Sequence, residues 1–499
     1  MKQTPSPVSG LLCILLSVLL LLPTLLSCGE TKQEPAAPPS DPAVGENAET
    51  EEVRVKPLAY LGERNFEGRV FNVLISGMDN SEWRQNNIDA DAENPEIINS
   101  ARFNRNIELE DTLNIKLTSS EHFGGNGPNE LKTAYKAGDE IYNCAQLMMT
   151  DAAKLTEDGY FIDMTTLPDL HLEDRWWDQR SVEDMTINGK LYHAVNASCI
   201  ASYNATFAVL FNKDLDEKYH VAENHKIGSP YEAVLDGKWT YDLFSSMVRS
   251  VSHDLNGDGK MGPQDLFGLC LWVDSITGAI NSGLEYCCQV NEDGQFELTL
   301  DTERVQDIVD KFVTFAADAN VTADYINKGY SSYDLFAGDH ALFYMQEINR
   351  ITAFRDMESD FGILPMPKFD EAQQVYRSCV AENDGVLLGV PALISDEEFT
   401  GCVLDGLARL SEEYVMPAYY DITLQRKAAR DEESGRMLDI IFTTRAYDLG
   451  WIYQVGALKN NMKSIVQGGE SNISRIVAKR RSMVSRMLKD INEAFEKVG

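Results

Sequence analysis

The stretch RVFNVLI, residues 69–75, begins the order of strands and helices that decides the fold. Its apolar residues alternate as in a β-strand, and residues 96–114 place apolar residues near helical spacing. A second strand, IKLTSS (115–120), is followed by a short helix (129–138) that ends at a glycine, and by the buried strand YNCAQLMM (142–149). The sequence therefore predicts an α/β fold whose parallel sheet has right-handed crossovers.

In such a sheet, ligands bind beyond the carboxyl ends of the strands. The segments that follow Ile75 and Met149 are therefore expected to form part of a site. The first contains Asp79, Asn80 and Trp83, and the second contains Thr150 and Asp151.

The rest of the chain continues the alternation. FAVLFNKDL (207–215) reads as a strand, and residues 239–253 as a helix that Thr240 caps and that has one apolar face. Three more apolar strands are predicted between residues 340 and 391, and the final third is helical by its periodicity.

The N-terminus reads as an export signal. Residues 1–27 carry one charge, Lys2, and end in a short apolar run before Cys28, where LLSC resembles a bacterial lipobox whose cysteine is lipid-modified. The alternative is a plain N-terminal membrane anchor, for which the run of about 17 residues is of marginal length. Both interpretations place the rest of the chain on the extracytoplasmic face of the cell membrane.

Residues 28–57 are rich in Pro, Ala and Glu and poor in apolar residues, which predicts a flexible tether. The remaining chain exceeds the roughly 250 to 300 residues at which single cores stop growing, so two lobes are expected. Without the signal, 43 basic residues face 79 acidic ones, a net charge of −36. A chain with this net negative charge would repel nucleic acid and anionic lipid headgroups, and it favours the binding of cations.

Cysteine usage and the known catalytic motifs give no enzyme assignment. Seven cysteines remain after the signal and Cys28 are set aside, without metal-type spacing or a disulfide framework, and Cys287 and Cys288 read as strand or loop residues. There is no GxSxG, HExxH or P-loop pattern. The many acidic residues supply carboxylate pairs by chance, so no catalytic residue is assigned.

Residues 254–265, DLNGDGKMGPQD, match the spacing of a calcium loop. Gly259 permits the sharp turn at its sixth position. The expected metal ligands are Asp254, Asn256, Asp258, the carbonyl of Lys260, and Asp265, where Asp replaces the usual Glu. The alternative is a solvated glycine-rich turn. Because only one such loop is present and an apolar strand follows it, calcium here is predicted to be structural.

Several of the six tryptophans lie beside Asn, Asp or Glu. Aromatic faces stack on sugar rings while neighbouring polar groups take the hydroxyls, so this mixture is typical of carbohydrate sites. Trp239, at the start of an amphipathic helix, is assigned to the core.

The order of segments resembles the extracellular solute-binding proteins of family 1, the lipoprotein receptors of bacterial carbohydrate importers. The resemblance runs from about residue 60 to the end and is carried by these segments: GYFIDMTTLPDL, WW, NGKLYHA, AVLFNKDL, GKWTYDLFSSM with its DLNGDGK loop, FAGDHALFYM, DFGILPMPKFDEAQQVY and AYYDITLQRKAARDEESGRMLDIIF. It implies a two-lobed, periplasmic-binding-protein-like class II fold with a hinge between the lobes and the ligand in the cleft.

The resemblance also implies domain boundaries. The first lobe would comprise residues 58–207 with 343–388, and the second 208–342 with 389–499, so that the chain crosses near 207, 342 and 389. The implied ligand-binding residues are Asp79, Asn80, Trp83, Thr150, Asp151, Trp177, Asn204, Thr206, Trp272, Gln346, Glu347, Tyr447, Asp448 and Trp451.

The resulting hypothesis is a monomeric, lipid-anchored receptor that captures a carbohydrate, an oligosaccharide by preference, and delivers it to an ABC transporter permease. Two alternatives stay open. One is a secreted carbohydrate-active enzyme, which would need two carboxylates roughly 5 to 9.5 Å apart. The other keeps the fold but binds a peptide, a polyamine or a metal chelate.

Overall fold

The computed structural model describes residues 56–77, 88–123, 125–318, 321–323, 331–354, 356–425 and 432–497. The chain divides into two units, Met1–Arg54 and Val55–Gly499, and all described residues belong to the second. The expected signal, Cys28, nearly all of the tether, and Asp79, Asn80 and Trp83 lie outside the described residues. Among the described helices, none is both long and apolar enough to cross a membrane.

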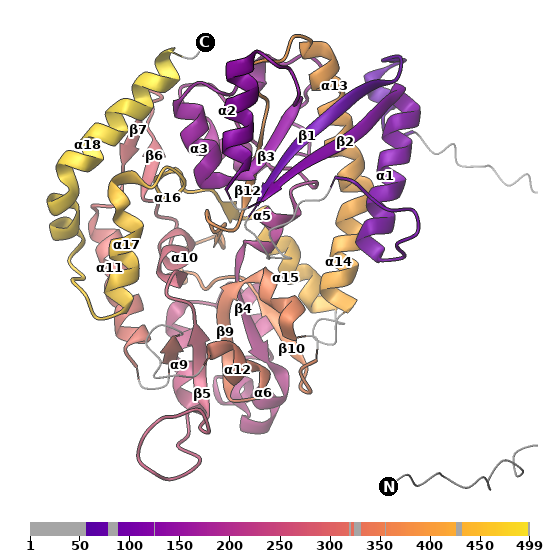
Figure 1. Cartoon of the computed structure of the whole chain (residues 1–499). Coiled ribbons are helices and arrows are strands. Elements are labelled where there is room, and N and C mark those ends of the chain that lie inside the picture. The colour runs from indigo at the N-terminus through magenta and orange to yellow at the C-terminus, as the bar shows by residue number, and fades with distance from the viewer. Residues whose placement is uncertain are drawn as a thin grey trace, which may run out of the picture. The chain divides into compact units, whose positions relative to one another are not determined.

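A four-stranded sheet in the order β12-β3-β1-β2 lies in the upper half of Figure 1. Its strands are β1 (Arg69–Gly77), β2 (Ile115–Phe123), β3 (Cys144–Met148) and β12 (Val386–Gly389). β1 runs parallel to β2 and β3, and β12 runs antiparallel to β3. The predicted parallel arrangement of the first three strands is therefore confirmed.

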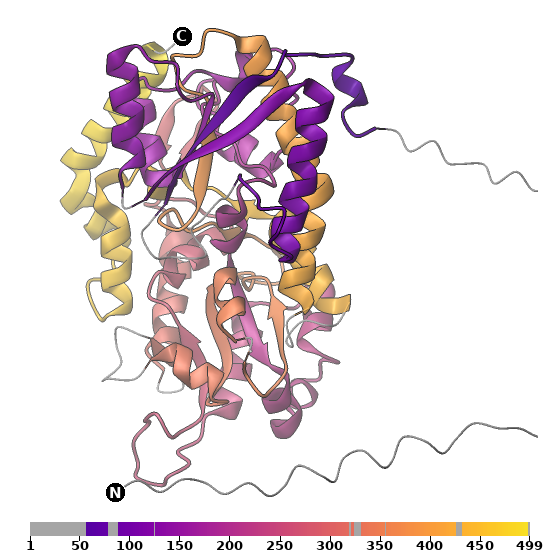
Figure 2. The same ribbon diagram turned by 45° about the vertical axis from the view of Figure 1, so that its right-hand side comes forward.

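Helices cover both faces of this sheet. They are α1 (Ile97–Leu113), α2 (Gly127–Ala137), α3 (Met149–Glu157) and α13 (Glu397–Leu410). α2 and α3 pack on one side, and α1 with α13 on the other (Figures 1 and 2). Gly138 ends α2 with a φ of 72°, a left-handed conformation that glycine adopts without a Cβ clash.

The second sheet has five strands in the order β10-β4-β9-β5-β8. They are β4 (Phe207–Asn212), β5 (Phe267–Leu271), β8 (Val321–Ala323), β9 (Ala341–Glu347) and β10 (Phe361–Leu364). β5 runs parallel to β8 and β9, whereas β4 runs antiparallel to β9 and β10. Every described side chain of β4, β5, β9 and β10 is buried, because helices and loops cover both faces.

The helix α9 (Tyr241–Val251) packs against β5 and β9 through the predicted apolar face. Phe244, Met247, Val248 and Val251 are fully buried. The hydroxyl of Thr240 accepts a hydrogen bond from the backbone N–H of Leu243 at 3.4 Å, as expected for the predicted cap. Trp239 is buried, as predicted, and its Nε1–H donates to the carbonyl of Pro365 at 2.9 Å.

The structure divides the strands between the sheets differently from the predicted lobes. Residues 343–388 were assigned to the first lobe, yet β9 and β10 are hydrogen-bonded into the second sheet, and only β12 joins the first. The chain enters the second sheet at Phe207, near the predicted crossing. It returns to the first sheet between Leu364 and Val386 rather than near 342. The predicted crossing was wrong because the sequence of an apolar strand carries no local signal for the strand with which it pairs.

The C-terminal residues, expected in the second lobe, contact both sheets or their helices. After α13 comes a π-helical turn (Ser411–Val415), which packs on α1, followed by α14 (Met416–Gln425) and α15 (Glu432–Thr443), which contacts β10. α17 (Leu458–Val466) contacts α10 (Ser275–Ser282) and α11 (Glu303–Ala316). The last helix, α18 (Ile473–Lys497), contacts α3 and α17.

Shorter elements complete the chain. The helices are η1 (Ala59–Leu61), η3 (Met164–Thr166), α4 (Gln179–Met185), α5 (Ile200–Asn204), α6 (Lys213–Tyr219), α7 (Val221–Asn224), α8 (Pro230–Leu235), α12 (Ser332–Ala337), η4 (Ile348–Phe354), α16 (Leu449–Ile452) and η6 (Val455–Ala457). β6 (Cys288–Val290) pairs with β7 (Phe296–Leu298), and β11 (Ser378–Cys379) with β13 (Arg445–Ala446). The seven cysteines of the described residues are buried and free.

Candidate functional site

The segments that cross between the sheets contact one another. The backbone N–H of Ala381 donates to the carbonyl of Ala205 at 2.9 Å, and Thr206 forms a β-bridge with Val380. These crossing segments, with the strand ends beside them, form what we call the junction: residues 149–151, 204–207, 272–274, 346–348 and 379–385.

Strands of both sheets end at the junction. In the first sheet, β3 ends at Met148, and the N–H of Met149 donates to the carbonyl of Gly385 at 3.2 Å. In the second, β9 ends at Glu347, and the N–H of Trp272, which follows β5, donates to the carbonyl of Met345 at 3.3 Å. The predicted placement of a site at strand carboxyl ends thus corresponds to a region where the two sheets meet.

A buried ion cluster ties the two sheets together at the junction. The ammonium of Lys459 lies 3.1 Å from the carboxylate of Asp274 and 2.5 Å from that of Glu382, and Lys463 lies 3.0 Å from Asp274. Burial opposes the charge of Lys459, but the two carboxylates outweigh it and raise the pKa of its ammonium. Because Asp274 follows β5 and Glu382 precedes β12, this lysine on α17 links both sheets.

Glu347 is 5 % exposed, and burial, followed by the neighbouring charge of Asp384, raises the pKa of its carboxyl to about 7. A carboxyl group with this pKa is partly protonated near neutrality, so it can both donate and accept hydrogen bonds. Gln346 is also buried, and its side-chain oxygen accepts from the hydroxyl of Tyr344.

Thr150 and Asp151 lie in the first turn of α3 and are half-buried. Burial raises the pKa of the Asp151 carboxyl, although Lys154 and Lys132 oppose the shift. Trp272 is also half-buried. These three predicted residues keep some exposed surface at the junction.

Asn204 and Thr206 lie in the crossing segment itself. The side-chain oxygen of Asn204 accepts from the hydroxyl of Tyr419 at 2.9 Å. Thr206 is fully buried, and its hydroxyl donates to the carbonyl of Ser202 at 3.0 Å. Both therefore hold the crossing segment in place, and their expected position near a hinge stays a prediction.

Tyr447, Asp448 and Trp451 are almost fully buried. The hydroxyl of Tyr447 donates to the carboxylate of Asp178, which also pairs with Arg445 at 2.7 Å. Asp448 caps α16 and accepts from the N–H of Cys287 at 2.7 Å and from the amide of Asn281 at 3.0 Å, and burial raises the pKa of its carboxyl to about 6. The structure thus engages Tyr447 and Asp448 in internal hydrogen bonds.

Trp177 lies outside the junction. It is 1 % exposed, and its Nε1–H donates to Asp405 of α13 at 2.9 Å. The same carboxylate accepts from the Nε1–H of Trp176 at 3.1 Å and from the hydroxyl of Tyr60 at 2.5 Å. This arrangement fastens the start of the described chain to α13, which is a structural role.

The sequence interpretation missed Asp274, Glu382, Asp384 and Lys459. They come from three separate segments and share no spacing motif, so only the tertiary contacts bring them together. An aspartate at the end of an apolar strand was the one available signal, and Asp274 fits it.

The predicted calcium loop joins α9 to β5. The side-chain oxygens of Asp254, Asn256 and Asp258 accept from backbone N–H groups of the loop at 2.7 to 2.8 Å. Asp265 is buried and accepts from the N–H groups of Leu255 and Gly262 at 2.9 and 2.7 Å. Lys260 is exposed.

Across the described ranges, no three His, Cys, Asp or Glu side chains group as a metal site. The donor chemistry suits a hard cation, but in this conformation the donors bind the loop's own backbone.

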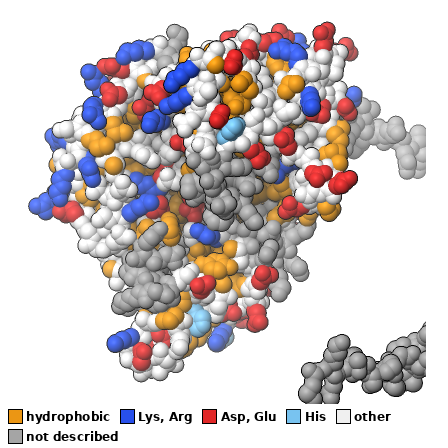
Figure 3. Space-filling model, viewed as in Figure 1, with side chains coloured by type: hydrophobic (Ala, Val, Ile, Leu, Met, Phe, Trp, Pro, Cys, Tyr) orange, Lys and Arg blue, Asp and Glu red, His pale blue; other side chains and the backbone are white. Residues whose placement is uncertain are grey.

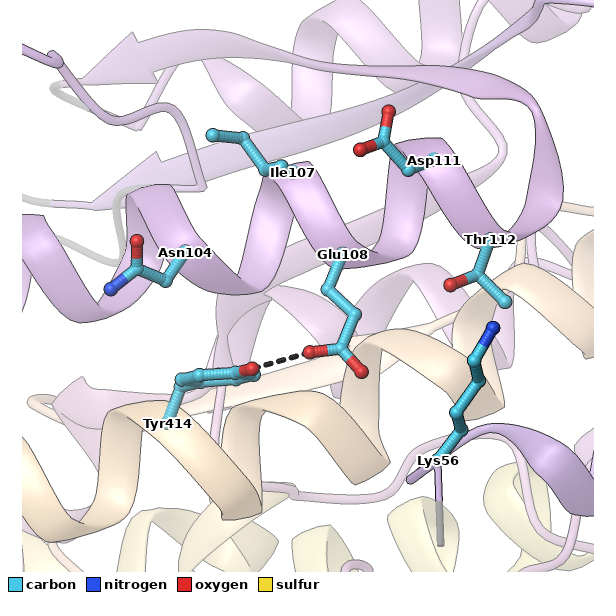
Figure 4. Close-up of a pocket in the computed structure, with 7 residues that line it drawn as sticks. All are labelled: Lys56, Asn104, Ile107, Glu108, Asp111, Thr112 and Tyr414. Carbon is cyan, nitrogen blue, oxygen red and sulfur yellow. Dashed lines mark hydrogen bonds between the residues drawn. The ribbon is translucent and has the colours of Figure 1, made fainter. Parts of the chain in front are cut away.

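A groove of about 530 Å³ lies elsewhere, on the outer face of α1 beside the π-helical turn (Figure 4). It is lined by Lys56, Asn104, Ile107, Glu108, Asp111, Thr112 and Tyr414. The hydroxyl of Tyr414 donates to Glu108, so part of this polar surface is internally paired. None of the predicted ligand residues lines it.

Two β-sheets with helices on their faces, joined by crossing segments and with strand ends of both at one junction, define an α/β fold of two parts. No family model matches the chain, and no curated protein matches it in sequence. Solved structures, however, share its fold over most of its length.

One is the cyclic alpha-maltosyl-1,6-maltose binding protein from Arthrobacter globiformis: 13% identity, 85% of this chain and 100% of that chain covered, TM-score 0.56. A second is a cyclo/maltodextrin-binding protein complexed with maltotetraose, with 11% identity, 85% and 98% coverage and a TM-score of 0.55. A third is an ABC substrate-binding protein from Listeria monocytogenes in complex with cycloalternan, with 13% identity, 86% and 99% coverage and a TM-score of 0.51.

At these identities the similarity establishes the fold. The chain has the two-lobed α/β fold of these substrate-binding proteins, which confirms the predicted fold class. The resemblance to the solute-binding proteins of carbohydrate importers is confirmed at the level of fold.

Proposed function

We propose that this protein is a solute-binding receptor that captures a carbohydrate at the junction between its two sheets. The carbohydrate that we expect is an oligosaccharide. The observation that carries the proposal is the meeting of strand ends from both sheets at one junction, in a fold shared with sugar-binding proteins of ABC transporters. The proposal involves capture and delivery to an ABC permease, with no bond made or broken.

The junction offers the groups that sugar binding needs. Trp272 supplies an aromatic face, and Asp151 and Glu347 supply carboxyl groups for hydroxyls. The crossing segments at 204–207 and 379–385 would act as the hinge. Ligand must bind the closed state better than the open one, since a ligand that binds both equally shifts nothing.

The test is a thermal-shift screen of the chain against a panel of glycans, with small-angle scattering on the hits. At a concentration of 100 times Kd, a ligand adds about 2.7 kcal/mol of stability, which a melting curve detects. Trp272→Ala should weaken the shift strongly, whereas Trp176→Ala, a half-buried tryptophan outside the junction, should retain it. If no glycan changes the melting temperature or the scattering profile, the sugar proposal fails.

Two further measurements separate the alternatives: an assay for reducing ends, and the same thermal-shift screen with polyamines and peptides. The raised pKa of Glu347 beside Asp384 is the feature that favours an enzyme, because a partly protonated carboxyl group can act as a general acid. Release of reducing ends from an oligosaccharide, lost in Glu347→Gln, would establish that reaction. A shift produced by polyamines or peptides alone would assign the junction to a cationic or peptide ligand.

We further propose that Cys28 is lipidated and holds the monomeric receptor at the extracytoplasmic face of the membrane, beside its permease. The support is the apolar run that ends in LLSC. Labelled fatty acid should enter the chain in the producing cells, and Cys28→Ser should abolish the label. Loss of the chain should lower uptake of its labelled ligand. A label that persists in Cys28→Ser would contradict the anchor.

Calcium binding at residues 254–265 is likewise a proposal, supported by the spacing of Asp254, Asn256, Asp258 and Asp265. Bound calcium would fasten the connection between α9 and β5, with a Kd of roughly 10⁻⁴ to 10⁻³ M by analogy with extracellular modules. Calcium should raise the melting temperature of the wild type and leave Asp258→Ala unchanged. An equal response of both proteins would refute the site.

A further inference from the structure

The last helix has a charge opposite to that of the rest of the chain. Residues 471–489 contain six basic residues and no acidic one, in a chain whose formal net charge is −35. They are Arg475, Lys479, Arg480, Arg481, Arg486 and Lys489. Figure 3 shows Lys and Arg side chains along the left edge, where α18 runs in Figure 1.

α18 is held to the body by its other face. Ile476, Val484, Ile491 and Phe495 are buried, and the ring of Phe495 lies 5.1 Å from that of Tyr192. The basic residues therefore belong to a packed helix rather than to a loose terminus.

Most of the basic side chains point outward and are weakly paired. Lys479 and Lys489 are 63 % and 72 % exposed, and each faces one glutamate, at 3.9 and 3.4 Å. Arg481 and Arg486 are exposed and make no ion pair within the described residues. Surface pairs of this kind contribute little, so the face keeps its positive potential.

An exposed apolar side chain lies beside two of these basic residues. Met483 is 38 % exposed, and it follows Lys479 by four residues and precedes Arg486 by three, so it lies about one helical turn from each. A helix whose outer face combines basic residues with a flexible apolar side chain matches the interface of an anionic bilayer, where the charges meet headgroups and the apolar group enters the acyl boundary.

We propose that the outer face of α18, formed by Lys479, Arg481, Met483, Arg486 and Lys489, docks on anionic phospholipid headgroups. The acidic body is repelled by such a surface, so contact is restricted to this face. The charge contrast thus selects one orientation of the receptor on the membrane. The inference does not depend on the identity of the ligand or on sugar binding.

The test is co-sedimentation of residues 29–499 with vesicles of phosphatidylglycerol and phosphatidylcholine, or of phosphatidylcholine alone. This chain omits the apolar run and Cys28, which would bind vesicles themselves, and it keeps the whole compact unit from Val55 onward. Binding to the anionic vesicles alone is expected, and it should weaken from 20 to 300 mM NaCl because salt screens the attraction.

The deciding comparison is between two variants of equal net charge. Arg481→Glu/Arg486→Glu/Lys489→Glu should lower vesicle partitioning at least ~100-fold, since each basic residue near an anionic surface contributes about fivefold or more. Lys218→Glu/Lys226→Glu/Lys238→Glu changes exposed lysines near the second sheet and should lose far less.

The milder Arg481→Gln/Arg486→Gln/Lys489→Gln should give an intermediate loss, and circular dichroism verifies folding in each case. Equal loss in both charge-reversed variants, or equal binding to both kinds of vesicle, would overturn the proposal. Binding to soluble acidic protein without binding to anionic vesicles would also overturn it, and would assign the face to a protein partner.

Discussion

At the scale of single residues, two lysines of α17 offer a matched comparison, because both pair with Asp274. Lys459 is 11 % exposed and also pairs with Glu382, whereas Lys463 is 33 % exposed. Lys459→Met would leave Glu382 buried without its cation, which costs about 3 to 5 kcal/mol. Lys463→Met should cost about 1 kcal/mol or less.

Urea unfolding of the two variants measures this difference. Equal losses would show that the ion cluster does not fasten the junction as the geometry indicates. Because Lys459 links segments from both sheets, the larger loss should appear in one cooperative transition.

Glu347 predicts a pH dependence of stability. Its folded pKa, about 7, lies above the ordinary 4.5, so the folded protein holds a proton that the unfolded chain has released between these values. The resulting stability is fully present below pH 4.5 and is lost as the pH rises through 7, by at most about 3 kcal/mol.

Glu347→Gln should therefore flatten the fall in unfolding free energy between pH 5 and 8, and should stabilise the ligand-free protein at pH 8. Glu358→Gln, at an exposed position in the same region of the chain, is the control and should follow the wild type. A Glu347→Gln profile parallel to that of the wild type would contradict the raised pKa.

At the scale of elements, α9 depends on its cap. Thr240 is buried and its hydroxyl accepts from the N–H of Leu243, so Thr240→Ala should cost about 0.5 to 2 kcal/mol. Thr240→Ser keeps the accepting oxygen and should recover most of the loss, as measured by urea unfolding. A serine variant as unstable as the alanine variant would assign the effect to packing of the threonine methyl group instead.

The elements that could be predicted from the sequence are those with local signals. β1, α1 and α9 follow from alternation, helical spacing and a capping threonine, and all three are present. The sheet membership of β9 and β10 could not be predicted. Both are short apolar runs, and their hydrogen-bonding partners lie far away in the sequence.

The candidate site divides in the same way. Strand ends are local features, so Thr150 and Asp151 could be predicted at the end of β3, whereas Trp272 was expected only from the resemblance to solute-binding proteins. Lys459 and Glu382 lie 77 residues apart and become neighbours only through tertiary packing. Trp177 shows the reverse difficulty: charged residues flank the pair Trp176 and Trp177 in the sequence, but the fold buries Trp177 against Asp405.

At the scale of the whole molecule, charge and fold act together. The chain carries 79 acidic residues against 44 basic ones, and six of the basic ones lie in the stretch 471–489. The remaining surface is therefore more acidic than the average suggests. Mutual repulsion of like charges destabilises a compact state, and salt relieves it.

Melting curves in 10 and 150 mM NaCl test this repulsion, because the Debye length falls from about 30 to about 8 Å between these concentrations. The melting temperature should rise by about one degree, the shift that roughly 1 kcal/mol produces in a chain of this size. Arg481→Glu/Arg486→Glu/Lys489→Glu adds acidic charge to the outer face of α18 and should respond more steeply to salt than the wild type. A melting temperature that falls with salt would mean that attractive ion pairs, such as Lys459 with Glu382, outweigh the repulsion. In that case the repulsion between acidic groups would not be the electrostatic effect that dominates the stability of the fold.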